Sequence, residues 1–191
     1  MIVPSEKLLK SIDLASHLHR DQNRHDAVNT PYISHLFGVA ILLASQTDDE
    51  DIVIAGIMHD SLEDVPEYTY DDLARDCGER VADIVRGVTE NKSLPYKERK
   101  LAYLDHLRIG MIESLMVSVA DKLHNARSLH TMPVEKQHNG HMILYNEVLK
   151  IARERTLSYV DVERHGDIEN PLITSLANII KNIETQQSIV D

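Results

Sequence analysis

The sequence predicts an all-α protein that folds as a single domain over residues 1–191. Its apolar residues recur mainly at intervals of three and four, the spacing that places side chains on one face of a helix. The chain has 7 glycines and 6 prolines, too few for the many turns of a β-rich fold. Hydrophobic residues form 42% of the chain, which excludes a disordered protein, and the length leaves little room for a second domain.

The first two helices are predicted on either side of a polar segment, DQNRHDAVNT. The first helix should span residues 5–22. Its apolar face comprises Leu8, Ile12, Ala15 and Leu18. After the polar segment, Thr30 and Pro31 have the character of an N-cap and a first helical residue, so the second helix is expected to begin there.

A third helix is predicted to begin in the acidic cluster TDDED, because carboxylates stabilise a helix N-terminus. It should continue to about Asp64, since Pro66 prevents further helical hydrogen bonding. Thr69 and Asp72 then resemble a capping box. The short helix that they begin should end at Gly78, a residue type that readily adopts the left-handed conformation.

The second half of the chain is predicted to be helical apart from two polar, proline-containing breaks, TENKSLPYKER and HGDIENP. The most apolar helix should cover residues 112–129. Its β-branched run Val117-Ser118-Val119 is compatible with a buried strand, but more than ten residues of periodic pattern favour a helix. Further helices are expected around residues 81–88, 101–107, 134–155 and 172–183.

The charge and composition of the chain limit the kinds of binding partner and the cellular compartment that we expect. The chain has 20 Lys and Arg against 31 Asp and Glu, a net charge of −11, which disfavours nucleic acid polymers and anionic membranes. The longest apolar runs, such as 39–44, fall far short of the roughly 20 residues of a membrane span, and the first 20 residues lack a signal-peptide core. The single cysteine, Cys77, excludes an internal disulfide and is expected to be structural. These features predict a cytoplasmic protein.

The segment HDSLED, residues 59–64, concentrates four ionisable groups at the end of an apolar helix. Helical spacing would stack His59 over Glu63 and Asp60 over Asp64. Burying several carboxylates is costly without compensation, and a divalent cation is one natural compensation. The mixture of imidazole and carboxylate suits a transition metal better than calcium. The alternative is a solvated final turn of the helix.

Two further residues extend this cluster. Asp121 lies in the apolar run SLMVSVAD, where an ionised carboxylate needs a partner. His35 lies one turn into the second predicted helix, although a histidine there is often a core residue bonded to a carbonyl. With His59 and Asp60, the two residues supply two imidazoles and two carboxylates, a complete metal site with room for water. Asn125 shares the helix face of Asp121.

Four segments in order resemble the hydrolase domain of RelA/SpoT proteins, within the HD phosphohydrolase superfamily: RHDAVNTPYISH, AGIMHDSLEDV, GVTENKSLPYKERK and VADKLHNARSL. Their spacing is most similar to that of the stand-alone small alarmone hydrolases, including the metazoan SpoT homologues, over about residues 14–149. The resemblance implies an all-α HD helical bundle with C-terminal helices over residues 150–191. It also implies Mn²⁺-dependent removal of the 3′-pyrophosphate from the guanosine polyphosphate (p)ppGpp.

The resemblance also implies roles for individual residues. The family's four metal ligands are matched by His35, His59, Asp60 and Asp121. The acidic pair that positions and activates the attacking water is matched by Glu63 and Asp64. The residues expected to contact the substrate are Arg24, His25, Lys92, Lys97, Asn125, His141 and Tyr145.

The chain departs from the family at two of these positions. His25 stands where a lysine usually follows the arginine, and His141 stands where relatives often have arginine. Positive charge at both positions therefore depends on pH. Two alternatives stay open: hydrolysis of another phosphorylated small molecule, such as the NADPH 2′-phosphate or a nucleotide, and a non-catalytic alarmone-binding regulator.

The remaining histidines are expected at the surface or at helix ends. They are His17, His19, His106, His124, His130, His138 and His165. His124 adjoins Asn125 and is the one with a further possibility, a place behind the metal ligands.

Overall fold

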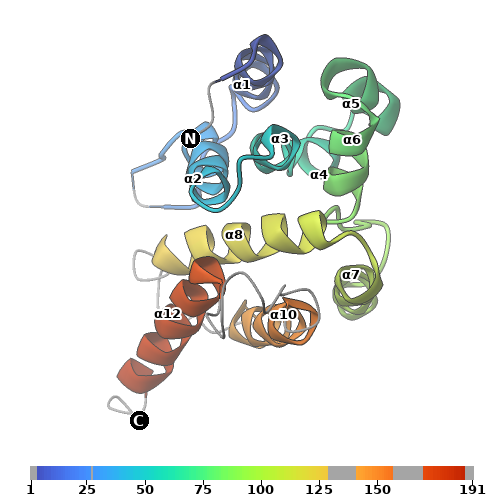
Figure 1. Cartoon of the computed structure of the whole chain (residues 1–191). Helices are drawn as coiled ribbons and strands as arrows, with labels where there is room; N and C mark the ends of the chain where they lie inside the picture. Colours follow the sequence, from blue (N-terminus) through green and yellow to red (C-terminus); the bar gives the residue numbers. More distant parts are fainter. Residues whose placement is uncertain (1–3, 27, 129–140, 157–169, 188–191) are drawn as a thin grey trace.

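The computed structural model describes residues 4–26, 28–128, 141–156 and 170–187, and the regular elements in these ranges are helices (Figure 1). They are α1 (Glu6–Leu18), α2 (Ile33–Ala44), α3 (Glu50–Met58), α4 (Ser61–Asp64), α5 (Tyr70–Cys77), α6 (Glu79–Arg86), α7 (Tyr96–Ile109), α8 (Ile112–Ser128), α10 (His141–Thr156) and α12 (Pro171–Gln187). Extended pairing in the described residues is an isolated antiparallel bridge between Asn23 and Pro31. The all-α prediction is confirmed.

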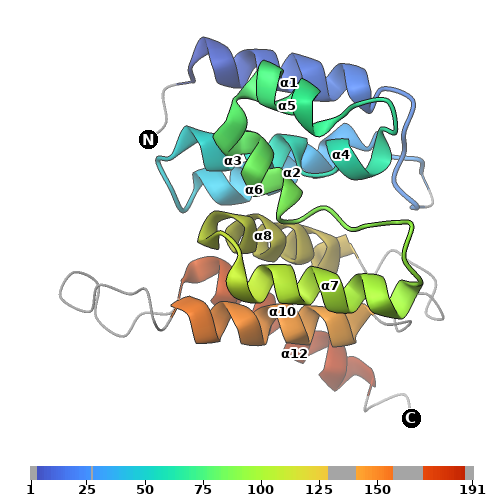
Figure 2. The same ribbon diagram turned by 90° about the vertical axis from the view of Figure 1, so that its right-hand side faces the viewer.

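Helix α8 lies in the middle of the molecule. Helices α1 to α6 lie on one side of it, and α7, α10 and α12 lie on the other (Figures 1 and 2). Its apolar residues explain this position, since Val117, Ala120 and Leu123 are fully buried. The stretch 117–119 is helical, as predicted. Polar residues on α8 are therefore held inside the protein rather than at its surface.

Helix α3 is buried on every side, with Ile52 to Met58 inaccessible to solvent. Its N-cap is Asp49, whose carboxylate accepts a hydrogen bond from the Asp51 amide, so the acidic start is confirmed. The predicted continuation to Asp64 is wrong, because the helix ends at Met58 and α4 begins at Ser61.

Local side-chain bonds account for this break. The Ser61 hydroxyl donates to the Met58 carbonyl at 2.7 Å, and His59 Nδ1 donates to the Gly56 carbonyl at 2.9 Å. These bonds occupy carbonyl groups at the end of α3. The predicted stacking along one uninterrupted helix is therefore wrong as well: His59 and Asp60 lie in the turn between the helices, and Glu63 and Asp64 lie on α4.

The connection into α2 also differs from the prediction. Helix α2 begins at Ile33, and the Tyr32 N-cap makes no side-chain capping bond. Pro31 instead belongs to the bridge with Asn23, where the Arg24 amide donates to the Thr30 carbonyl at 2.8 Å. The loop pairs with itself instead of starting the helix at Thr30, because this pairing satisfies backbone groups on both sides of the loop. The pairing fixes the segment that carries Arg24.

The other boundaries follow the predictions with small shifts. Helix α1 ends at Leu18, four residues early, while Thr69 and Asp72 form the predicted capping box. Gly78 has the expected positive φ of 92°, but its ψ of 151° is extended, and it joins α5 directly to α6. Helix α7 takes in Tyr96, which was expected in the preceding loop.

Helices α10 and α12 match the last two predicted helices, and the predicted stretch 134–140 lies outside the described residues. Cys77 is buried, as expected of a structural residue. Within the described ranges, no helix has the length and hydropathy that crossing a membrane requires.

Candidate metal centre and its pocket

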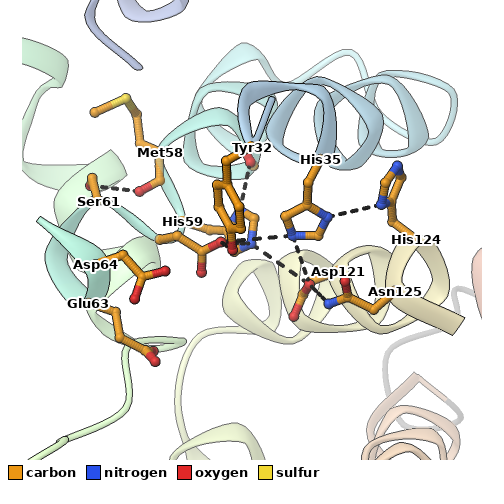
Figure 3. Close-up of polar contacts among 12 residues, drawn as sticks. Tyr32, His35, Met58, His59, Ser61, Glu63, Asp64, Asp121, His124 and Asn125 are labelled. Atoms are coloured by element: carbon orange, nitrogen blue, oxygen red, sulfur yellow. Dashed lines mark hydrogen bonds and ion pairs between the residues drawn. The ribbon is translucent and has the colours of Figure 1, made fainter. Parts of the chain in front are cut away.

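Four predicted metal ligands converge from three parts of the chain, and three of them, His35, His59 and Asp121, are labelled in Figure 3. His35 comes from α2, His59 and Asp60 from the turn between α3 and α4, and Asp121 from α8. The Nε2 atom of His35 lies 3.2 Å from Asp121 Oδ1, and the Nε2 atom of His59 lies 3.1 Å from Asp60 Oδ2. The two crossed distances, His35 to Asp60 and His59 to Asp121, are both 3.8 Å. Ligand atoms of His35, His59 and Asp121 thus all lie within 4.8 Å of one another, and Asp60 lies beside both imidazoles.

The hydrogen bonding of His59 shows what this point can hold. Its Nδ1 donates to the Gly56 carbonyl, so Nε2 is the atom that faces the cluster. Nε2 is buried and has no hydrogen-bond partner among the described residues. Two carboxylates beside a buried imidazole nitrogen require a positive charge, which either a proton on that nitrogen or a cation can supply. The donor set therefore fits a divalent cation.

The protonation behaviour of the cluster also indicates a site for positive charge. Burial would raise the pKa of Asp60, but the adjacent His59 holds that pKa below its usual range, and Lys122 does the same for the pKa of Asp121. Burial alone would lower the pKa of His59, but the two carboxylates outweigh it and raise the pKa to about 9. Burial lowers the pKa of His35, whose ring is neutral at pH 7. The cluster attracts positive charge, whether a proton or a metal ion.

Two side chains that the sequence did not single out hold the carboxylates. The Tyr32 hydroxyl donates to Asp60 Oδ2 at 2.6 Å, and the Lys122 ammonium donates to Asp121 Oδ2 at 2.5 Å. Lys122 directly follows Asp121 in an apolar run, so a second buried charge was a signal for it. Tyr32 gave no such signal, because its role depends on how the loop before α2 folds.

The acidic pair lies on α4, across a cavity of about 160 Å³ from α8. One oxygen of Glu63 accepts a hydrogen bond from the Glu90 amide at 3.1 Å, and Lys92 lies 2.5 Å from an oxygen of Asp64. Burial raises the pKa of Glu63. The cavity is lined by residues that include His59, Asp60, Glu63, Asp64, Asp121 and Lys122. The structure thus brings the acidic pair and three of the predicted ligands, His59, Asp60 and Asp121, to one pocket, with His35 and Lys92 in contact with residues of its lining.

Arg24 and Asn125 lie at the same pocket. The Arg24 guanidinium donates to Asn125 Oδ1 at 2.7 Å and to Ser128 Oγ at 3.2 Å, and it lies 5.8 Å from the centre of the Tyr32 ring. Asn125 in turn donates to Asp121 Oδ1 at 2.6 Å. The loop before α2 is therefore tied to α8 beside the cluster.

Four other predicted substrate contacts are not among the residues that line this cavity. His25 and Lys97 are exposed, and no ion pair among the described residues joins Lys97 to the acidic pair. His141 is exposed at the start of α10, with its ring 6.0 Å from that of Tyr145. Tyr145 is buried in the core, where burial raises its pKa to about 12.

Two histidines that were expected at the surface or at helix ends lie inside the protein. His19 is buried at the end of α1, where Nδ1 lies 2.7 Å from Gln22 Oε1 and the ring stacks on Tyr32. His124 is half-buried on α8 beside His35. Burial, together with the charges of His35 and Arg24, lowers the pKa of His124 to about 4, so its ring is neutral at pH 7.

The other histidines follow the expectation or cannot be placed. His17 and His106 are exposed. His130, His138 and His165 lie outside the described residues.

Known proteins resemble this chain in sequence and in structure. The HD domain family matches residues 11–148. The guanosine-3′,5′-bis(diphosphate) 3′-pyrophosphohydrolase MESH1 of Danio rerio is 38% identical over 125 residues, which cover 64% of this chain and 69% of that protein. The Homo sapiens MESH1 is 37% identical over 126 residues, covering 65% and 70%. A solved structure titled as a metazoan ortholog of SpoT that hydrolyses ppGpp aligns with a TM-score of 0.80 at 26% identity, covering 95% of this chain and 98% of that chain.

Proposed function

The chain belongs to the HD-domain family and is related to metazoan SpoT homologues, and from this premise we propose that it is a metal-dependent hydrolase of the 3′-pyrophosphate of ppGpp. The products are GDP and pyrophosphate, or GTP and pyrophosphate when the substrate is pppGpp. One observation carries the proposal: the buried Nε2 atoms of His35 and His59 face the carboxylates of Asp60 and Asp121, beside a cavity whose lining includes an acidic pair.

The proposed metal ligands are His35, His59, Asp60 and Asp121, and Mn²⁺ is the proposed cation. Mixed imidazole and carboxylate donors suit such a borderline metal. When bound, the cation would supply positive charge to the phosphoryl group and make a water molecule more acidic. Lys122 holds the outer oxygen of Asp121, and Tyr32 bonds the oxygen of Asp60 that also faces the two imidazoles, so both carboxylates are already oriented.

Glu63 is the proposed proton acceptor for the attacking water, with Asp64 beside it. The Glu90 amide fixes one oxygen of Glu63, the other oxygen lies 3.6 Å from Lys92, and Glu63 lines the cavity. A raised pKa makes this carboxylate a stronger base than an exposed glutamate. Lys92 lies 3.6 Å from an oxygen of Glu63 and 2.5 Å from an oxygen of Asp64, so it adds positive charge beside both acids.

The diphosphate brings negative charge into an acidic pocket, and nearby cations offset it. Lys122 lines the cavity, Lys92 lies at its acidic side, and Arg24 lies beside Asn125. Cations placed where charge develops lower the barrier to phosphoryl chemistry. The net charge of −11 therefore does not prevent the binding of one small anion.

A substrate panel tests the proposal. The purified protein is incubated with ppGpp, pppGpp, NADPH, GDP and GTP, once with Mn²⁺ and once with a chelator. We expect pyrophosphate release from ppGpp that is lost with the chelator. Phosphate release from NADPH alone would assign a different substrate to the same pocket. Tight ppGpp binding without hydrolysis of any compound would assign a regulator.

A further inference from the structure

The ring of His124 lies directly behind His35, on the side away from the metal cluster (Figure 3). The two Nδ1 atoms are 2.9 Å apart, a hydrogen-bond distance, and the ring centres are 4.9 Å apart at an angle of 60°. The Nε2 atom of His35 faces Asp121 and Asp60. His35 is therefore held at both ring nitrogens, by the cluster on one side and by His124 on the other.

A hydrogen bond between two imidazole nitrogens needs one proton and one lone pair. If the Nε2 lone pair of His35 is to bind a cation, its proton must lie on Nδ1, and Nδ1 must be the donor. Nδ1 of His124, 2.9 Å away, must then be the acceptor, which places the proton of His124 on its Nε2. Ligating histidines usually donate this outer bond to a carboxylate or a carbonyl; here the acceptor is an imidazole.

We propose that His124 is a positioning residue that fixes the tautomer and ring orientation of His35 for metal binding. The inference rests on the proposed metal centre and deepens it, because it assigns the acceptor for the outer nitrogen of a ligand. The sequence allowed His124 a place behind the metal ligands because it adjoins Asn125, but it did not identify the ligand: His35 is 89 residues away, and the two meet only where α8 packs on α2.

A second observation supports the assignment. Gly38 lies on α2, one turn after His35, and a Cβ atom at this position would lie 2.2 Å from both Cδ2 and Nε2 of the His124 ring. Such a distance is far below van der Waals contact, so any side chain at position 38 would displace the ring. A glycine inside a helix is unfavourable without a packing reason. The space that Gly38 leaves for the His124 ring is that reason. Helix α2 thus provides both the ligand His35 and the space in which His124 packs against it.

Metal affinity, measured directly, tests the proposal. Mn²⁺ binding is measured by isothermal titration calorimetry, and Co²⁺ substitution reports ligand geometry through its visible absorption. His124→Phe keeps the ring but removes the acceptor, and it should weaken Mn²⁺ binding by about 10- to 100-fold. His124→Asn places a carbonyl oxygen near the position of Nδ1, and it should retain most of the affinity. His106→Phe, at an exposed position on α7, is the matched control and should leave binding unchanged.

The substitution Gly38→Ala tests the role of His124 independently. Alone, it should weaken Mn²⁺ binding by pushing the ring away; in a His124→Ala background it should cause no further loss. Thermal unfolding of the metal-free variants separates this effect from a general loss of stability.

The outcomes distinguish this inference from the proposal on which it rests. A wild-type protein that does not bind Mn²⁺ would overturn the metal centre itself. Wild-type binding with unchanged affinity and Co²⁺ spectrum in His124→Phe would overturn only the role of His124. Equal losses in the Phe and Asn variants would also overturn it, since an acceptor would then not be what matters.

Discussion

The metal centre and the rim of the pocket are built in different ways. At the centre, His35, His59 and Asp121 are buried, and each is held by a hydrogen bond to a neighbouring group. At the rim, His25 and Lys97 lie exposed. The deep groups come from packed helices and the α3–α4 turn, whereas the rim is made of loops and helix starts.

This difference suggests that the buried centre carries out the reaction and that the exposed rim determines the specificity for the substrate. Groups held by packing and hydrogen bonds keep one geometry, which a reaction centre requires. Exposed side chains can change without cost to the core, and both departures from the family pattern, His25 and His141, are exposed. Substitutions at the centre should therefore abolish turnover, and substitutions at the rim should tune the binding of the substrate.

The largest effect is expected from Asp60→Ala. It removes a carboxylate from the cluster and leaves the buried Nε2 of His59 facing one acid instead of two. We expect hydrolysis to fall below detection and the bound metal to be lost. Metal content by atomic emission and pyrophosphate release measure the two quantities. A variant that keeps its metal and its turnover would remove Asp60 from the ligand set.

Glu63→Gln should be nearly as damaging to turnover but harmless to metal binding. The amide can still accept from the Glu90 backbone, so the fold of the loop is kept, but it cannot take a proton from water. We expect kcat to fall by about 10²- to 10⁴-fold. Glu67→Gln, at an exposed position just after α4, is the control. Turnover within a few-fold of wild type would contradict the proton-acceptor role.

The pH profile of the wild type provides a finer test of the same residue. Burial raises the pKa of Glu63 above its usual 4.5, and a proton acceptor works only when deprotonated. The kcat should therefore rise with pH along an acidic limb whose midpoint lies above 4.5. The limb should disappear from the residual activity of Glu63→Gln. An unchanged limb in that variant would assign it to another group.

The contrast between centre and rim also explains which parts of the site could be predicted from the sequence. The ligand residues lie in short motifs with polar groups inside apolar helices, and that conflict is visible without a structure. The break between α3 and α4 was not predictable in this way, because helical spacing continues through it. It depends on Ser61 and His59 bonding to carbonyls of α3.

The supporting residues were hidden for a related reason. Tyr32 reaches Asp60 only because the loop before α2 pairs with itself, and His124 reaches His35 only because α8 packs on α2. Contacts of this kind join residues 28 and 89 positions apart. Periodicity reports which face of a helix is buried, but not which neighbour that face meets.

The smallest effect is expected at the rim, from His141→Arg. Partial burial and the charges of Lys100 and Lys122 lower the pKa of His141 below 6.5, so the native side chain is mostly uncharged at pH 7. Arginine would restore a permanent charge near an anionic substrate. Exposed charge pairs contribute about 0.2–1 kcal/mol, so KM for ppGpp should fall by about 1.5- to 5-fold with kcat unchanged.

Salt and pH separate this rim effect from a change at the centre. The gain in KM from His141→Arg should shrink at high ionic strength, because exposed charges are screened. It should also shrink at low pH, where the native histidine becomes charged and matches the arginine. A change in kcat, or a gain that persists in high salt, would mean that position 141 acts on the reaction centre and that the division between centre and rim is wrong.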